Sequence, residues 1–401
     1  MDRREFIRNS MLASGAFMVP SFLKPFEYLA KDAILDGYRS LVIIQLSGGN
    51  DGLNTIVPYR NDIYYNSRPK IALPQDKIIK VNDELGFNAA LQPLKEIYDK
   101  GWMTIMNSVG YPNPDRSHFR AMDIWQTASS ANQFLNTGWL GRYLDSDCPD
   151  CKNAYNIIEV DDTLSLAVKG EYRTGLAIKN PKQLYDATRD PFFKEMVSVY
   201  KNDHLNEDNL GYLSKTMIET YSSAEYVYET SKTYTNNVEY PDNPFAKNLK
   251  TIATFINSGL KTRVYYVSQT GFDTHVGQVN TQARLFKNYA ESVSAFLKDL
   301  DKNNKLNDTL VLTFSEFGRR VAQNASNGTD HGTANNMFIY GGRLKKQGIY
   351  NAAPDLTDLD QGDLKYKLDF REVYATALHK WLGVKDSSIL DPGFAGLDFI
   401  A

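Results

Sequence analysis

Two short segments of the chain place a carboxylate close to an imidazole. Asp273 stands two residues before His275, just after the apolar run 263–267, and Asp330 stands directly before His331 in a glycine-flanked loop. An Asp-x-His pair in extended backbone projects both side chains to the same side, as chelation of one ion requires. Each pair alone also fits an aspartate that caps a turn beside an ordinary polar histidine. Further ligands from other segments are needed to favour a metal site.

Two more carboxylates follow apolar runs. Asp51 lies in the glycine-rich loop 47–52 after the run 41–46, and Glu316 follows the run 310–314. Open α/β sheets bind ligands at the carboxyl ends of their strands, so both are candidate metal ligands. Asp51 could instead initiate a turn. A phosphate-binding loop is disfavoured there, because the P-loop lysine and the GxGxxG spacing are both missing.

Ser117 and His118 open a segment with helical spacing that runs to residue 125. Ser117 therefore falls at a helix N-terminus, where a serine commonly caps the helix by accepting a backbone N–H. It could equally be a nucleophile or a hydroxyl that faces a metal, because the helix dipole favours an anion at the same place. The sequence does not choose between these roles.

The elements that must position these residues alternate between strand and helix. Apolar runs at 41–46, 102–109, 263–267, 310–314 and 337–340 predict strands, and helical spacing at 90–98, 245–260, 285–300 and 369–382 predicts helices between and after them. This rhythm predicts an α/β fold with a mostly parallel sheet, interrupted by a helical insertion at about 190–235. The candidate residues then converge at one edge. Oxygen and imidazole ligands without a thiolate suit one or two divalent ions, namely zinc, manganese, calcium or magnesium.

Composition and the N-terminal segment limit the classes of function that the chain could have. The chain has 401 residues, 42% of them hydrophobic and 23% charged, and a net charge of -3, which is typical of a globular protein that does not bind nucleic acid. Arg3 and Arg4 precede a short apolar segment, which predicts a twin-arginine signal at 1–30, recognition by the Tat translocase and a periplasmic or otherwise extracytoplasmic location. An amphipathic helix is the alternative. No apolar run reaches the ~20 residues of a stable membrane span. Outside the cytoplasm, Cys148 and Cys151 could form a local disulfide.

A set of motifs resembles a known family in both order and spacing. The chain carries SGGNDGLNTIVPY, RSHFRAMDIW, GWLGRYL, QTGFDTH, SEFGRR, NGTDHG and DFREVYATALHKWLG. Together they resemble the DUF1501 proteins, which are exported bacterial proteins related to the alkaline phosphatase and sulfatase superfamily. The resemblance implies an alkaline-phosphatase-like α/β/α sandwich over 38–401 as a single domain, with a metal site that binds a phosphate or sulfate ester.

The resemblance also implies roles for individual residues. Asp51, Asp273, His275, Glu316, Asp330 and His331 match metal-binding positions, and Ser117 matches the nucleophile that opens a helix. We expect Ser117 and the adjacent His118 to be the catalytic residues. The chain departs from the superfamily in having Ser315-Glu316 where Asp-His usually ends the strand, and Asp-x-His in place of Asp-x-x-x-His. These departures predict a remodelled metal site.

Two function classes fit these features. The first is an exported metal-dependent hydrolase of small-molecule or polymeric phosphate or sulfate esters, with Arg116, Arg319 or Arg320 as candidate anion clamps. The second is a non-catalytic extracytoplasmic protein that binds metal or polyanions, or that serves in assembly. A serine hydrolase triad is disfavoured, because no G-x-S-x-G elbow exists and Ser117 and His118 are adjacent.

Overall fold

The computed structural model describes residues 38–146, 153–200, 209–384 and 387–401. Within it, Arg39–Ala401 form one compact unit. The expected signal segment at 1–30 and the pair Cys148 and Cys151 lie outside the described residues, so both stay predictions. None of the helices in the described ranges is long and apolar enough to cross a membrane.

A nine-stranded sheet forms the centre of the described part of the chain. All pairings within it are parallel except those of one strand, β10, which runs antiparallel to both of its neighbours. The strands of the sheet follow one another in space in the order β11 (Gly348–Ile349), β5 (Met103–Gly110), β10 (Asn335–Tyr340), β9 (Thr309–Phe314), β1 (Ser40–Ser47), β8 (Val264–Thr270), β6 (Ile157–Glu159) and β7 (Leu176–Ala177). The short strand β14 (Leu368–Asp369) also pairs with β5. The five strands expected from apolar runs are β1, β5, β8, β9 and β10, and the expected mostly parallel sheet is confirmed.

The strand β1 shows why this sheet is covered on both sides. Its residues alternate between two hydrophobic cores, with Leu41 and Ile43 in one and Val42, Ile44 and Leu46 in the other. Successive side chains of a strand point to opposite faces, so an unbroken apolar run can be buried only between two layers.

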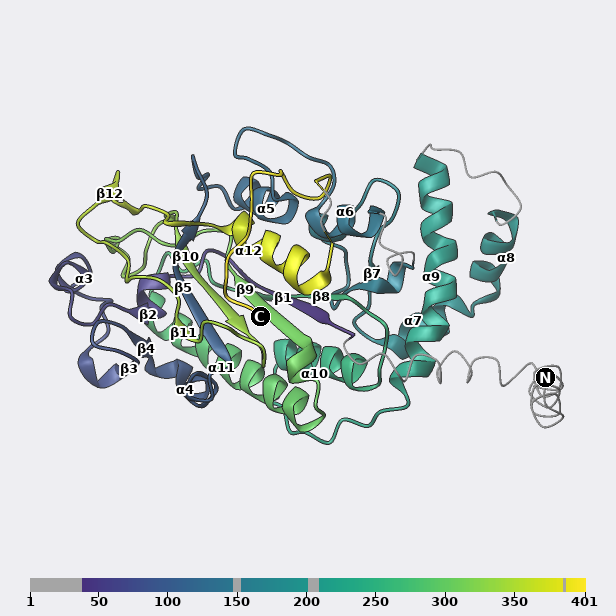
Figure 1. The fold of residues 1–401 in the computed structure, drawn as a ribbon, viewed down its shortest axis with the longest axis horizontal. Coiled ribbons are helices and arrows are strands. Elements are labelled where there is room, and N and C mark those ends of the chain that lie inside the picture. Colours follow the sequence, from purple (N-terminus) through teal and green to yellow (C-terminus); the bar gives the residue numbers. More distant parts are fainter. Residues whose placement is uncertain (1–37, 147–152, 201–208, 385–386) are drawn as a thin grey trace, which may run out of the picture. The chain divides into compact units, whose positions relative to one another are not determined.

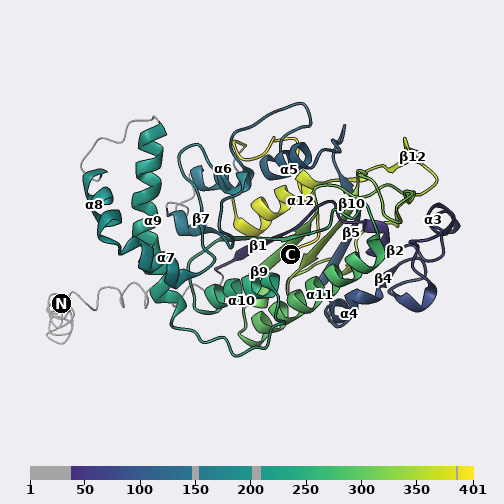
Figure 2. The same ribbon diagram turned by 180° about the vertical axis from the view of Figure 1, so that it is seen from behind.

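Helices supply those two layers, as Figures 1 and 2 show from opposite sides. One face is covered by α4 (Gln92–Asp99), α10 (Pro244–Asn257) and α11 (Gln278–Lys302), and the other by α5 (His118–Thr127), α6 (Trp139–Asp145) and α12 (Phe370–Thr376), which continues into the π-helical turn η8 (Ala377–Leu382). The fold is therefore an α/β/α sandwich, as expected.

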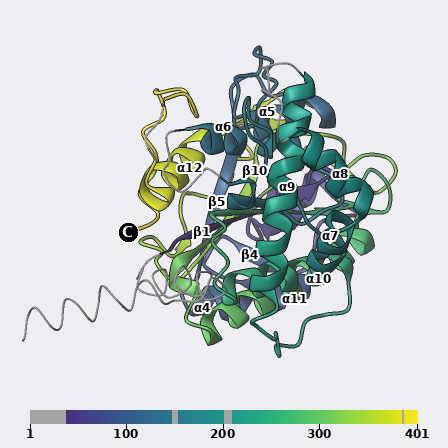
Figure 3. The same ribbon diagram turned by 90° about the vertical axis from the view of Figure 1, so that its right-hand side faces the viewer.

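The remaining elements lie at the two ends of the sheet. Beyond β7 stand the helices α7 (Pro181–Thr188), α8 (Pro191–Tyr200) and α9 (Asn209–Ser231), which pack on one another (Figure 3). α8 and α9 lie within the region of the helical insertion expected at about 190–235, and α7 precedes it. At the other end lie α3 (Asp62–Ser67) and two small sheets, β2 (Ile56–Val57), β4 (Gly86–Asn88) and β3 (Ile78–Lys80) in one and β12 (Leu359–Asp360) and β13 (Asp363–Leu364) in the other.

The loops that carry the candidate residues lie at the end of the sheet where the parallel strands finish. The strands β1, β8 and β9 are parallel neighbours, with Ile43 of β1 opposite Tyr266 of β8 and Leu312 of β9. Their carboxyl ends consequently lie side by side. The loops that follow them can contribute side chains to one place even though more than 200 residues separate β1 from β8.

Candidate metal centre

Three histidines point their Nε2 atoms at one carboxylate oxygen. Asp273 Oδ1 lies 3.4 Å from Nε2 of His118, 3.1 Å from Nε2 of His275 and 3.3 Å from Nε2 of His331. The Nε2 atoms of His275 and His331 are 2.9 Å apart. These side chains are between 24% and 48% exposed, so a small solute can reach the centre of the cluster.

Each imidazole is oriented from behind through its Nδ1 atom. Nδ1 of His118 contacts Glu316 Oε1 at 2.9 Å, and Nδ1 of His275 contacts Asp330 Oδ1 at 3.2 Å. Nδ1 of His331 contacts the backbone oxygen of Arg116 at 2.7 Å. An ionised carboxylate and a backbone carbonyl can only accept, so each Nδ1 donates and each neutral ring presents a lone pair on Nε2. The Nε2 of His275 also faces Nη1 of Arg319 at 3.4 Å.

This arrangement is the one that metal-bound histidines share in proteins. A tetrahedral site with metal–nitrogen distances of 2.0–2.1 Å has ligands about 3.3 Å from one another, which matches the separations of Asp273 Oδ1 from the three Nε2 atoms when that oxygen is counted as a ligand. The buried His118 Nε2 has no hydrogen-bond partner among the described residues. The donor set of imidazole nitrogens and a carboxylate therefore fits a divalent ion of the zinc or manganese type.

Arg319 joins the loops that carry these ligands. Its guanidinium is fully buried and donates to Gly49 O at 2.6 Å, to Thr329 O at 2.9 Å and to Asp273 Oδ1 at 2.6 Å. One side chain thus connects the loops after β1, β8 and β9. Because these acceptors occupy it inside the protein, the expected use of Arg319 as a free anion clamp is not supported by its position.

The close approach of two of these loops depends on Gly48, whose φ is 120°. A Cβ atom there would lie 2.4 Å from the backbone nitrogen of Asp273, so a side chain is excluded. The Gly48 amide also donates to Glu316 Oε1 at 2.8 Å. Glu316 thereby receives a fixed position from which it orients His118.

The charged groups of the cluster shift one another's pKa values. Burial raises the pKa of Asp273, but the hydrogen bond and positive charge of Arg319 outweigh burial and hold that pKa at about 2. Burial lowers the pKa of the His331 imidazole, which keeps its Nε2 lone pair available. The hydrogen bond that His118 donates to Glu316 raises the pKa of His118.

Asp51 is not brought to this cluster. Its carboxylate is 1% exposed and pairs with the fully buried Arg68 at 2.6 Å, and it also accepts hydrogen bonds from Gln278 and from the backbone of Leu53. It is the N-cap of the short 3-10 helix Gly52–Asn54, so the turn-initiating alternative describes its surroundings. Sequence reasoning missed Arg68, because nothing in its polar loop signals that the side chain is buried.

Glu316 and Asp330 stand behind the histidines rather than among their Nε2 atoms. His118 lies in front of them, with the ligand atoms of His118, Asp273 and His331 all within 4.8 Å of one another. The ring of Phe317 packs against both His118 and His331 at centroid distances of 4.8 Å. The structure therefore brings His118, which was expected as a catalytic residue, among the candidate ligand atoms, and it places Glu316 and Asp330, which were expected as ligands, at the Nδ1 atoms of His118 and His275.

Ser117 is the N-cap residue of α5, as expected, yet its side chain makes no capping hydrogen bond. Its backbone nitrogen donates to Asp115 Oδ1 at 2.7 Å, and the residue is exposed. The hydroxyl is consequently free for another use, one residue away from the ring of His118.

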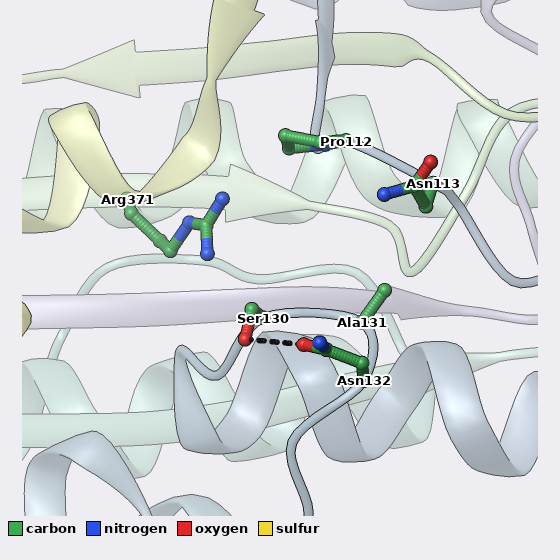
Figure 4. Close-up of a pocket in the computed structure, with 6 residues that line it drawn as sticks. All are labelled: Pro112, Asn113, Ser130, Ala131, Asn132 and Arg371. Carbon is green, nitrogen blue, oxygen red and sulfur yellow. Dashed lines mark hydrogen bonds between the residues drawn. The ribbon is translucent and has the colours of Figure 1, made fainter.

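A separate hollow of about 410 Å³ lies beside the loop that leads to Ser117. Pro112, Asn113, Ala131, Asn132 and Arg371 line it together with Ser130, whose hydroxyl bonds to Asn132 (Figure 4). Arg371 is already neutralised by Asp369 at 2.6 Å. With no unpaired charge or convergent acid and base, this hollow is a weaker candidate for chemistry than the histidine cluster.

Comparisons with known proteins place the chain in a family without assigning it an activity. A family model described as "Protein of unknown function (DUF1501)" matches residues 38–393, which confirms the resemblance noted in the sequence. No curated protein matches the chain significantly.

Solved structures of similar fold include three bacterial proteins. A putative sulfatase from Bacteroides thetaiotaomicron has 10% identity over 90% of this chain and 73% of its own, with a TM-score of 0.42. The PsFucS1 sulfatase from Pseudoalteromonas sp. has 14% identity over 94% and 73%, with a TM-score of 0.38. The C-terminal periplasmic domain of EcEptC from Escherichia coli, in complex with Zn, has 11% identity over 90% and 88%, with a TM-score of 0.40. At these scores the likenesses carry no argument about what this chain does.

Proposed function

The chain belongs to the DUF1501 family of proteins of unknown function, and we propose that it is an extracytoplasmic, metal-dependent hydrolase of phosphate or sulfate esters. One observation carries the proposal: the Nε2 lone pairs of His275 and His331 face each other at 2.9 Å, and both atoms approach the same Asp273 oxygen as His118 Nε2. Lone pairs repel at such a distance unless a proton or a cation lies between them.

We assign the ligand roles from these contacts. His118 and His331 bind the ion through Nε2, within the group whose ligand atoms lie within 4.8 Å of one another, and His275, whose Nε2 lies 2.9 Å from that of His331, joins them from outside that group. Glu316 and Asp330 orient the rings of His118 and His275. Arg319 holds Asp273 Oδ1 at 2.6 Å, which weakens that oxygen as a ligand and favours a set of imidazoles with one position left for substrate. Asp51 supports the loop after β1 through Arg68 and is not proposed as a ligand.

The formal charge favours one ion rather than two. The cluster contains the carboxylates of Asp273, Glu316 and Asp330 and the guanidinium of Arg319, so three negative charges and one positive charge leave -2. One divalent ion balances that charge, whereas a second would leave an excess of two positive charges in a partly buried site.

The chain's own residues supply the remaining parts of the reaction. A divalent ion at the three imidazoles would polarise the ester and offset the charge that develops on it. Ser117 is the candidate nucleophile, since its hydroxyl is exposed and free of capping at the start of α5. His118, the next residue, is held by Glu316 and so keeps this end of the helix in place against the cluster.

A non-catalytic metal-binding role is the second candidate. It is favoured if Asp273 completes a set of four protein ligands, because structural metal sites are closed whereas catalytic sites keep an open position. The facing of Asp273 Oδ1 toward all three Nε2 atoms is the observation on its side.

A screen of aryl phosphates and aryl sulfates with metal-loaded and chelator-treated protein separates the two roles. The hydrolase proposal requires turnover that disappears with the metal and returns on adding it back. His275→Ala should abolish both metal and turnover, while His379→Ala, on η8 and outside the cluster, should keep both. A metal-loaded protein that cleaves none of these esters would favour the binding role.

Export by the Tat translocase remains part of the proposal. It rests on Arg3, Arg4 and the apolar segment after them, which lie outside the described residues.

A further inference from the structure

Two arginines share one buried carboxylate beside the histidine cluster. Arg116 Nε donates to Asp363 Oδ2 at 2.8 Å, and Arg320 Nε lies 3.3 Å from Asp363 Oδ1. The Asp363 side chain is 0% exposed, whereas the two arginine side chains are 43% and 40% exposed. The buried carboxylate thus fixes the positions of two guanidinium groups, while both arginine side chains remain partly exposed to solvent.

The backbone places this pair next to the candidate metal centre. The carbonyl of Arg116 accepts the hydrogen bond from His331 Nδ1 at 2.7 Å, and the amide of Arg320 donates to the carbonyl of Asp330 at 3.1 Å. Both arginines are therefore joined through their main chains to the loop that carries Asp330 and His331. Their guanidiniums are tied to Asp363 rather than to a residue of the cluster, so an anion bound to them would lie beside the cluster and not within it.

Arg116 and Arg320 carry more positive charge than is required to neutralise the carboxylate of Asp363. One guanidinium neutralises one carboxylate, so the two arginines and Asp363 together carry a formal charge of +1, with the carboxylate of Asp330 also acting on Arg320 from the neighbouring loop. Arg116 uses Nε and Nη2 on Asp363, and Arg320 uses Nη2 on the carbonyl of Gln361. Within the described ranges, the Nη1 groups of both arginines have no hydrogen-bond partner. Planar guanidinium groups that are already fixed in position are well suited to the oxygens of a phosphate or sulfate group.

We propose that Arg116 and Arg320 form a subsite for a second anionic group of the substrate, a phosphate or sulfate group next to the ester that reacts. This inference rests on the proposed function, because it assumes that the histidine cluster binds the reacting ester. It narrows the substrate class to esters with at least two phosphate or sulfate groups. It also gives the exposed guanidiniums a role that neutralisation of Asp363 does not require.

Calorimetric titration of inorganic pyrophosphate into the chelator-treated full chain tests the subsite without the metal. Arg116→Gln and Arg320→Gln should each weaken binding at least about tenfold, since each removes charge-assisted hydrogen bonds. Each single variant keeps one arginine on Asp363, which protects the fold. Arg343→Gln is the matched control, because Arg343 is 41% exposed and pairs with Asp308 at 3.1 Å. It should bind pyrophosphate as the wild type does.

A second set of variants and a metal assay keep the two proposals separable. Arg116→Lys and Arg320→Lys preserve the charge but lose the planar fork, so their affinities should fall between those of the wild type and the glutamine variants. Metal content should stay at the wild-type value in all of them. Unchanged pyrophosphate binding in both glutamine variants, or an equal loss in Arg343→Gln, overturns the subsite. Absence of metal from the wild-type protein would overturn the proposed function. The pyrophosphate titration would still test the subsite, because it is carried out without the metal.

Discussion

The Nε2 atoms of His275 and His331 lie 2.9 Å apart, although the two residues come from different loops. Asp330 and the carbonyl of Arg116 hold the protons of these rings on Nδ1. Two Nε2 lone pairs are thereby brought into contact, with Nη1 of Arg319 at 3.4 Å from that of His275, and a shared cation would make this arrangement favourable. Much of the chemistry proposed for this protein depends on that pair.

The carboxylates behind the histidines should matter for metal affinity without being essential. Glu316→Gln and Asp330→Asn keep a carbonyl oxygen that can accept from Nδ1 but remove its negative charge. Loss of such orienting partners typically weakens metal binding 10- to 100-fold, and we expect that range in competition with a fluorescent chelator. Asp355→Asn, at an exposed position, is the control. Complete loss of metal in Glu316→Gln or Asp330→Asn would instead identify that carboxylate as a direct ligand.

Asp51 should stabilise the fold and leave metal binding unchanged. Asp51→Ala strands the buried guanidinium of Arg68, which should cost roughly 3–5 kcal/mol in urea unfolding. Asp51→Asn, which keeps the side-chain oxygen, should lose less. Asp308→Ala, in the surface pair with Arg343, should cost no more than about 1 kcal/mol. If folded Asp51→Asn protein loses its ion, Asp51 is a ligand as the sequence first suggested.

The contrast between Asp51 and Asp273 shows how far sequence reasoning reaches. Both follow apolar strands, and the rule for strand ends correctly placed both at one edge of the sheet. Only three-dimensional contacts show that Arg68 neutralises one of them while three imidazoles surround the other. A sequence pattern indicates which residues follow a strand, but it does not indicate which buried charged side chain each of them will contact.

His118 and Arg319 illustrate the same limit for the ligand set. His118 was predicted at the start of a helix, and α5 begins at that residue. Its rotation toward Asp273 depends on Glu316 and Phe317, which lie about 200 residues further along the chain. The full burial of Arg319 among backbone carbonyls is equally nonlocal, so its sequence context suggested a surface clamp.

Glu159 should make the stability of the protein fall as the pH rises. This side chain is 4% exposed, and burial raises its pKa to about 7. Between the unfolded pKa, near 4.5, and about 7 the folded state binds more protons than the unfolded state, so unfolding becomes easier with increasing pH. Glu159→Gln removes this effect. It should match the wild type near pH 4 and exceed it by roughly 3 kcal/mol above pH 7 in urea unfolding. The exposed Glu84→Gln is the control, and a constant difference across the pH range would contradict the assignment.

Ser117 tests whether the reaction passes through a covalent intermediate. Because the hydroxyl makes no capping bond, Ser117→Ala and Ser117→Gly should change stability by no more than about 0.5 kcal/mol. Metal content should also stay constant, whereas turnover of any ester that the wild type cleaves should fall by orders of magnitude. Ser130→Ala removes another hydroxyl, bonded to Asn132, and should keep full turnover. Comparable cleavage by both Ser117 variants would rule out this nucleophile.

The most direct measurement is the divalent-ion content of the purified chain and of its His331→Gln variant. Each protein is first dialysed against divalent ions, then passed through gel filtration, and its ion content is determined by elemental analysis. We expect about one ion per wild-type chain, from the net charge of the cluster, and close to none in His331→Gln. The variant should stay folded, because this half-buried loop ligand lies outside the sheet. Phe119→Gln, one residue after His118 and 87% exposed, should retain the ion. A wild-type chain that holds no ion, or a His331→Gln chain that holds a full equivalent, would contradict the metal centre.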